Sequence, residues 1–344
     1  MSEQSRTHSD EPPTRKRPRT DSESSAASVG SDSSKEPFSR DGRFWYEDGN
    51  IVVIAGNVGF RVYKGLLSAH SDVFRDMFSL PQPGPDPVGD CPVVHVTDTA
   101  AELRSLLSVL LPTQFLPEHR FSTFEDLANC TRLAHKYGMK QLLEDSLKGL
   151  EYYFPSTLAS WDRRNKLAID TQAIVGVNVA RLTNTLSLLP AALYLCCQLT
   201  AEELIEGHPH SDNTEDTLSP EDLRLCLNKR AELCTLFMTS TLRDTFSPIG
   251  EDGECSTNSR CNNSIHSILS AHVTLTCSGY SNALYSSFKS LRNYFYKATP
   301  KPAYPLCSSC IKILVEREGN RRKQIWAELP KLFGLETDEK EREE

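Results

Sequence analysis

Residues 60–78 constrain the fold of this chain more than any other stretch, because the apolar pattern changes there from strand to helix spacing. Residues 60–63 (FRVY) alternate apolar and polar side chains, which is typical of a strand with one buried face. The apolar residues that follow recur at helical intervals, and a polar break at Ser71 predicts two short helices with a capped turn between them. These apolar residues are Leu66, Leu67, Phe74, Met77 and Phe78.

The neighbouring segments predict both strands and helices. Residues 51–54 (IVVI) indicate a buried strand, Gly56 and Asn57 a turn, and residues 92–96 a further strand. Serine or threonine followed three residues later by glutamate predicts a capping box at the start of two later helices, and a glycine predicts the end of the second. These positions are Thr99 with Glu102, Ser122 with Glu125, and Gly138.

Residues 60–78 resemble the core signature of the BTB (POZ) domain, in which an extended segment leads into a helix of the form Leu-x-x-x-Ser-x-x-Phe-x-x-Met-Phe. Lys64 matches a lysine of the family, whereas Tyr63 stands where the family usually has histidine. Residues 133–137 (LAHKY) resemble a later helix of the family, so the resemblance covers about residues 45–154. The signature positions are filled by Leu67, Ser71, Phe74, Met77 and Phe78.

The resemblance implies an α+β protein in which a small sheet with helices is followed by an all-helical domain. Pro190, a capping box at Thr200–Glu203 and an acidic cap at Ser219–Asp222 support the helical prediction for the second half. The polar segment at 207–217 predicts a loop, the helix after Ser219 is expected to carry Leu227 on its apolar face, and a later helix is expected from about Ile265. This layout resembles a set of BTB-domain proteins abundant in fungi. The expected parts are a disordered tail at 1–40, a BTB/POZ-like domain at 41–154, a helical domain at 155–334 and an acidic tail at 335–344.

The polar N-terminal tail contains one short basic cluster. A nuclear import signal has this composition and needs an accessible position, which a Ser- and Pro-rich tail provides. A solvated charge run is the competing interpretation. The sequence therefore predicts a nuclear or cytoplasmic protein, with an import signal at Arg15, Lys16, Arg17 and Arg19.

The composition excludes several classes of protein. The formal net charge of −8 argues against non-specific nucleic-acid binding. We find no apolar run of about 18 residues, which predicts no membrane span. The polar N-terminus predicts no secretory signal, so the 11 cysteines are expected to be reduced thiols.

Two cysteine pairs differ from the other cysteines because they enclose polar residues. Cys307 and Cys310 have the spacing with which two thiolates bind one metal from a turn, and Cys255 and Cys261 form a looser pair. Unrelated reduced thiols are the simpler interpretation. The alternative is one structural zinc held by all four, with His266 or His272 as a substitute ligand. The remaining cysteines lie mostly in apolar contexts and are expected to pack as small hydrophobic residues.

The sequence contains no Gly-rich phosphate loop, Gly-x-Ser-x-Gly elbow or His-Glu-x-x-His motif, so no catalytic residue is predicted. The resemblance implies a non-enzymatic protein that binds protein partners and self-associates through its BTB domain, as an adaptor or a transcription-associated scaffold. An apolar set that exceeds what a domain of about 110 residues easily buries alone is expected to drive the self-association. The residues assigned to this set are Phe44, Trp45, Val73 and Phe74.

Three alternatives remain at this point. Some BTB proteins are substrate adaptors for cullin-based ubiquitin ligases, and these usually carry a hydrophobic-x-Glu motif after the second helix. Residues 79–83 (SLPQP) lack this motif, which argues against a cullin partner. The others are a zinc-dependent nucleic-acid binder and an enzyme that uses the helical half.

Overall fold

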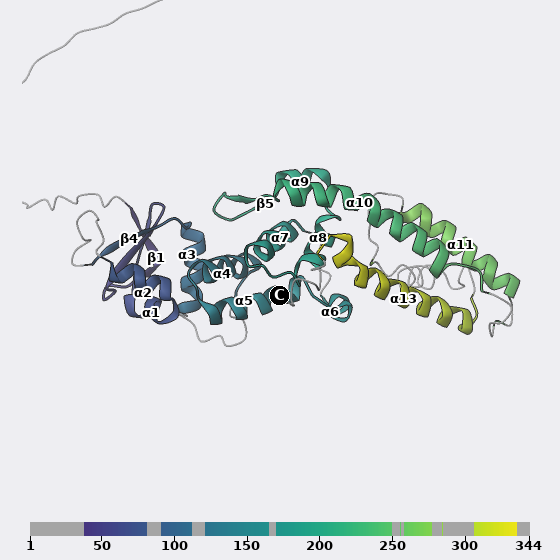
Figure 1. Cartoon of the computed structure of the whole chain (residues 1–344), viewed down its shortest axis with the longest axis horizontal. Helices are drawn as coiled ribbons and strands as arrows, with labels where there is room; N and C mark the ends of the chain where they lie inside the picture. The colour runs from purple at the N-terminus through teal and green to yellow at the C-terminus, as the bar shows by residue number, and fades with distance from the viewer. Residues whose placement is uncertain are drawn as a thin grey trace, which may run out of the picture. The chain divides into compact units, whose positions relative to one another are not determined.

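The strand pair predicted at residues 51–63 forms an antiparallel hairpin of β2 (Ile51–Ala55) and β3 (Val58–Val62). Gly56 closes it with a φ of 60°, a left-handed conformation that glycine adopts without steric cost. The computed structural model of the protein describes residues 38–80, 91–111, 121–164, 170–249, 255, 258–276, 284 and 306–335 (Figure 1).

β1 (Ser39–Trp45) and β4 (Val93–Val96) complete a mixed sheet in the order β1-β3-β2-β4. β1 runs parallel to β3, and β4 runs parallel to β2. β1 begins inside the tail predicted for residues 1–40, because the backbone N–H of Ser39 bonds the carbonyl of Asn57 at 2.8 Å. Residues 1–37 of that predicted tail lie outside the described residues, as does the acidic tail beyond residue 335.

Two short helices follow β3, as the polar break at Ser71 predicts. α1 (Lys64–His70) ends there and α2 (Asp72–Ser79) begins, with the Ser71 hydroxyl accepting a hydrogen bond from the N–H of Phe74 at 3.0 Å. The same hydroxyl donates to the carbonyl of Tyr137 at 2.6 Å. Ser71 therefore caps one helix and ties it to a segment 66 residues away.

α3 (Ala100–Leu110), α4 (Phe124–Lys136) and α5 (Lys140–Tyr153) share an apolar core with the sheet. The capping box predicted for α3 is confirmed, since the side chains and backbone of Thr99 and Glu102 bond reciprocally. The predicted glycine at the end of α4 is also confirmed, by the positive φ of Gly138.

The capping box predicted at Ser122 and Glu125 is wrong. Thr123 caps α4, one residue later, and accepts from the N–H of Asp126 at 3.0 Å. The shift takes the side chain of Glu125 out of the cap. Glu125 contacts a distant hairpin instead, as described below.

The second half of the described chain is helical, as predicted, apart from one hairpin. The helices include a π-helical turn, η1, that continues α10. They are α6 (Leu158–Arg163), α7 (Gln172–Leu182), α8 (Leu189–Cys196), α9 (Ala201–Glu206), α10 (Pro220–Ser240), η1 (Thr241–Thr245), α11 (Asn258–Thr276) and α13 (Ser308–Leu332). None of the helices in the described part of the chain has the length and apolar composition of a membrane span.

Two local expectations for this half are wrong. The polar segment at 207–217 is not a loop, because β5 (His208–Pro209) and β6 (Glu215–Asp216) pair as an antiparallel hairpin. The apolar face predicted for α10 is also displaced. Leu227 is 42% exposed, whereas its neighbour Cys226 is fully buried.

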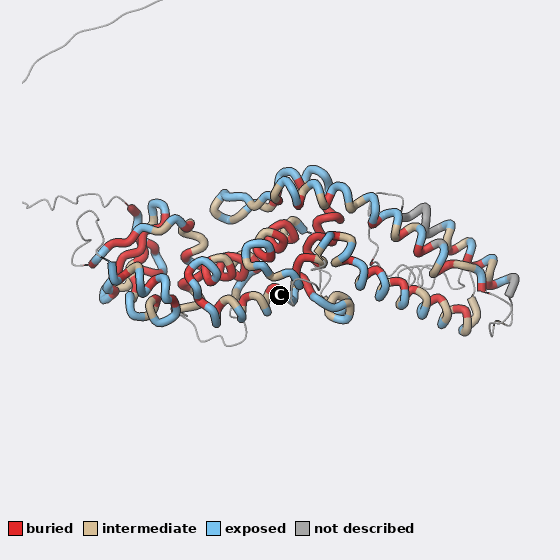
Figure 2. The backbone as a smooth tube through the Cα atoms, in the orientation of Figure 1, coloured by how far each residue is buried: buried red, intermediate tan, exposed pale blue. Residues whose placement is uncertain are grey.

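The largest core crosses the boundary predicted between the two domains. It contains Phe124 and Leu127 of α4 and Leu150 of α5, together with most of α7 and α8. Figure 2 shows buried residues along nearly the whole length of α7 and α8. The helical half is therefore built onto α4 and α5, and the described residues from Phe38 onward form one compact unit.

Candidate functional site

The signature residues at 67–78 build the domain core and do not form an open binding surface. Leu67, Phe74 and Phe78 are buried and Met77 is partly buried. Polar side chains beside them make local bonds: the ammonium of Lys64 donates to the carbonyl of Phe78 at 3.0 Å. Tyr63, at the histidine position of the family, donates to the carboxylate of Asp48 at 2.8 Å.

The apolar set expected to drive self-association is largely internal. Phe44 and Phe74 are completely buried in the core of their own domain, so this part of the expectation is wrong. The exposed apolar side chains on this helix are Val73 and the flanking Leu80, which are 40% and 64% exposed. Residues seven apart lie on nearly the same side of a helix, so the two extend one surface stripe along α2.

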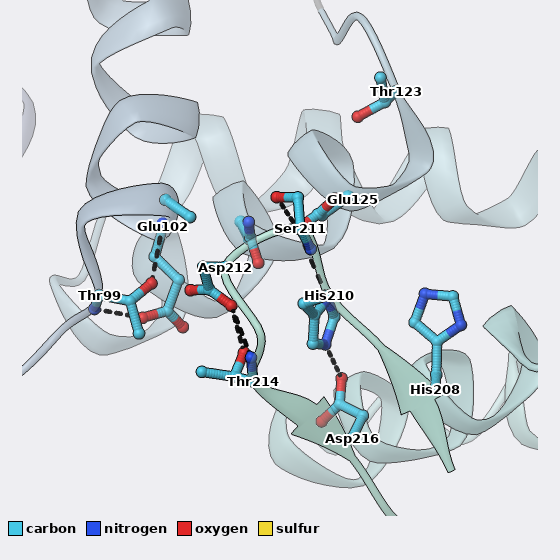
Figure 3. Close-up of polar contacts among 12 residues, drawn as sticks. Thr99, Glu102, Thr123, Glu125, His208, His210, Ser211, Asp212, Thr214 and Asp216 are labelled. Carbon is cyan, nitrogen blue, oxygen red and sulfur yellow. Dashed lines mark hydrogen bonds and ion pairs between the residues drawn. The ribbon is translucent and has the colours of Figure 1, made fainter. Parts of the chain in front are cut away.

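The β5–β6 hairpin is held against the first domain by a carboxylate that three elements share (Figure 3). Asp216 on β6 accepts hydrogen bonds from Arg132 of α4, from Asn178 of α7 at 3.2 Å and from Nε2 of His210 at 2.9 Å. Arg132 and Asp216 also form an ion pair that is mostly buried. Burial alone would raise the pKa of Asp216, but the Arg132 charge and the hydrogen bonds more than offset this and lower it.

Glu125 provides the second attachment of the hairpin. One of its carboxylate oxygens accepts from the backbone N–H and the hydroxyl of Ser211, at 3.1 and 2.8 Å, and lies 3.7 Å from Nδ1 of His210. A Cβ at Gly207 would lie 2.4 Å from the carbonyl oxygen of Asp216, so the hairpin needs glycine at that position. The sequence did not predict this cluster, because its pattern assigned Glu125 to a local capping box.

Side chains of the hairpin, α3 and α4 line a partly open polar pocket of about 270 Å³. The polar contacts here attach the hairpin and do not pair a nucleophile with a base. The Ser211 hydroxyl donates to Glu125, and both nitrogens of His210 face carboxylates. On the turn, the carboxylate of Asp212 accepts hydrogen bonds from the N–H and the hydroxyl of Thr214, and both residues line the pocket. Figure 3 shows these side chains pointing inward between the hairpin and α3 and α4.

The second cluster consists of the four cysteines that the spacing singles out. The structure brings together the sulfurs of Cys255, Cys261, Cys307 and Cys310, all within 4.8 Å of one another. The sulfurs of Cys255 and Cys307 are 3.7 Å apart. Cys261 and Cys310 are buried, and the other two are partly exposed. Such a group of four thiols could bind a metal ion.

The cluster lies where α11 meets the start of α13. Cys307 is the N-cap of α13, and its sulfur accepts from the N–H of Cys310 at 3.5 Å. The N–H of Cys307 in turn donates to the sulfur of Cys261, also at 3.5 Å. Burial and the neighbouring thiols raise the pKa of Cys310.

This cluster lies within a small separate apolar core. Apart from Cys261 and Cys310, its buried members are Phe246, Ile249, Ile265, Ile268 and Leu314. α11 begins at Asn258, earlier than the predicted Ile265, and therefore carries Cys261.

Among the other described cysteines only Cys234 is exposed, and Cys277 lies outside the described residues. The basic cluster at Arg15, Lys16, Arg17 and Arg19 also lies outside the described residues.

Residues 46–152 match the family model of the BTB/POZ domain. β2 to β4, α1 to α4 and all of α5 except its last residue lie in this range, while β1 precedes it. Residues 46–152 are therefore a BTB/POZ domain, a module of protein–protein interaction. Neither a curated protein nor a solved structure matches the chain.

Proposed function

We propose that the protein binds other proteins and self-associates through its BTB/POZ domain, as an adaptor or a transcription-associated scaffold. The match of residues 46–152 to this domain carries the proposal, because the domain is a protein-interaction module. The surface stripe of α2 supports it. Exposed large apolar side chains on one side of an element indicate an interaction site, and Val73 on α2 and Leu80 at its C-terminal cap are such side chains.

Sedimentation velocity of the full chain across micromolar concentrations tests self-association. The parent is expected to sediment as a dimer or larger species. Val73→Glu/Leu80→Glu places two charges on the stripe without touching the core, and this variant is expected to sediment as a monomer. Ile205→Glu is the matched control, because Ile205 is 65% exposed on α9, outside the BTB/POZ domain. A parent that is monomeric at every concentration contradicts the proposal.

We further propose that Cys255, Cys261, Cys307 and Cys310 hold one structural Zn²⁺. A tetrahedral ion with zinc–sulfur bonds of about 2.3 Å separates its four sulfurs by about 3.8 Å. The 3.7 Å between Cys255 and Cys307 matches this edge, and the widest pairs need to contract by about 1 Å. Four thiolates fill the coordination shell, so the chemistry is structural rather than catalytic.

The metal content of protein purified without added zinc tests this site. The parent and the control Cys234→Ser, which removes the exposed thiol on α10, are expected to contain about one zinc per chain. Cys307→Ser/Cys310→Ser is expected to lose the zinc and to melt at a lower temperature, because metal binding and local folding are coupled. Zinc far below this level in the parent, or unchanged melting of the double variant, contradicts the site.

A further inference from the structure

The four cysteines differ in how easily a dissolved reagent can reach them. Cys255 and Cys307 are partly exposed, while Cys261 and Cys310 are buried in the small core. The sulfurs of these two partly exposed residues are also in contact, at 3.7 Å. The spacing of Cys307 and Cys310 would suggest that these two react together. Cys310 is buried, however, and is therefore less accessible to a dissolved oxidant than Cys255 and Cys307.

We propose that Cys255 and Cys307 form a peroxide-sensitive dithiol whose oxidation to a disulfide releases the metal. This inference rests on the zinc site proposed above and concerns its regulation. The reaction needs the two sulfurs to move from 3.7 Å to a bond length of about 2.05 Å. It joins residues on two separate segments, 52 positions apart.

The reactive form of these sulfurs is the thiolate, which zinc stabilises. One of the two thiolates attacks hydrogen peroxide, forms a sulfur–oxygen bond and releases hydroxide. The second thiolate then attacks that sulfur, forms the disulfide and releases another hydroxide. Two electrons pass from the two sulfurs to the peroxide oxygens, and protons from solvent convert both hydroxides to water. Only Cys261 and Cys310 would then remain as ligands for a zinc ion, which is half of the four that a structural site needs.

Metal release has a structural consequence at this position. Without the ion, the start of α13 contacts α11 through the apolar side chains of the small core and through the bond from the N–H of Cys307 to the sulfur of Cys261. Each helix is also bonded to the segment that precedes α11, because Asn262 of α11 pairs with the backbone of Ile249 and Arg317 of α13 donates to the carbonyl of Ser247 at 2.7 Å. Oxidation is therefore expected to loosen the contact between these helices and to leave the BTB/POZ domain folded.

Zinc-loaded full-length protein treated with hydrogen peroxide tests the proposal, with released zinc followed by a chromogenic chelator. Trypsin then separates the relevant cysteines, because the peptide 244–260 contains only Cys255 and the peptide 298–312 contains only Cys307 and Cys310. Zinc release together with a cross-link of these two peptides, located by fragmentation at Cys307, is expected. Cys234→Ser is expected to behave like the parent, and a thiol reductant with added zinc is expected to restore the metal.

The other outcomes separate the two proposals. A parent that contains no zinc before peroxide is added overturns the metal site, and the regulation with it. A zinc-loaded parent that keeps its metal under peroxide overturns the regulation alone. Zinc release with a disulfide confined to the peptide 298–312 also overturns it, because Cys307 would then have reacted with Cys310.

Discussion

Ser71 offers the sharpest test of how the BTB/POZ domain is assembled. Its side chain is 2% exposed and makes two hydrogen bonds, one that caps α2 and one to the carbonyl of Tyr137. Ser71→Ala removes the cap, which costs about 1 kcal/mol. It also deprives a buried carbonyl of its hydroxyl donor, which costs about 1–3 kcal/mol. The expected loss in the free energy of unfolding is therefore about 2–4 kcal/mol.

Urea denaturation of the full chain, followed by circular dichroism, measures this loss. With a urea m-value of about 2–3 kcal/mol per molar, the midpoint is expected to fall by roughly 1 M. Ser79→Ala is the matched control, because the Ser79 hydroxyl makes its bond to Asp76 at an exposed position of the same helix. The control is expected to change stability by no more than about 0.5 kcal/mol. Equal midpoints for the two variants would refute the assigned role of Ser71.

Three further predictions concern other parts of the chain. Phe74→Ala, in the same urea assay, is expected to lose about 3–5 kcal/mol, because a fully buried ring is removed; a parent-like midpoint would mean that the ring is not in the core. The pKa of Asp216 is lowered on folding, so its contribution to stability is present above its unfolded pKa of about 4 and is lost as the pH falls through the folded value. Asp216→Asn is therefore expected to differ most from the parent in urea midpoint at neutral pH and less at acidic pH, and a gap that does not depend on pH would argue against this ion pair. We also propose that residues 15–19 direct nuclear import: Lys16→Ala/Arg17→Ala is expected to shift a fluorescent fusion toward the cytoplasm, and an unchanged distribution would leave the cluster as solvated charge.

Local patterns in the sequence predicted most of the BTB/POZ domain. The apolar run at residues 51–54, the turn at Gly56 and the capping box at Thr99 are decided by neighbours a few residues away, and all three are confirmed. The spacing within each cysteine pair is local as well, but the meeting of the two pairs is not, since Cys261 and Cys307 are 46 residues apart in the sequence. The continuation of one core across the boundary predicted at residue 154 was not predictable in this way, because that core is formed by contacts between residues distant in sequence.

The hairpin at 207–217 could not be predicted from its own residues. Its strands have two residues each, too few for an alternating pattern. Its stability depends on contacts 84 and 86 residues away in the sequence, from Arg132 to Asp216 and from Glu125 to Ser211. Glu125 also had a local interpretation as a capping residue, which competed with the correct one.

Helix α4 belongs to two cores at once, and this affects how the protein transmits force. Its first turns, with Phe124 and Leu127, pack in the helical core, while Leu133 and Ala134 near its end pack under the sheet. A flexible linker would let two domains swivel, but a shared helix carries torque from one to the other. A partner that binds the BTB/POZ domain and rotates it would therefore rotate the helical half as well.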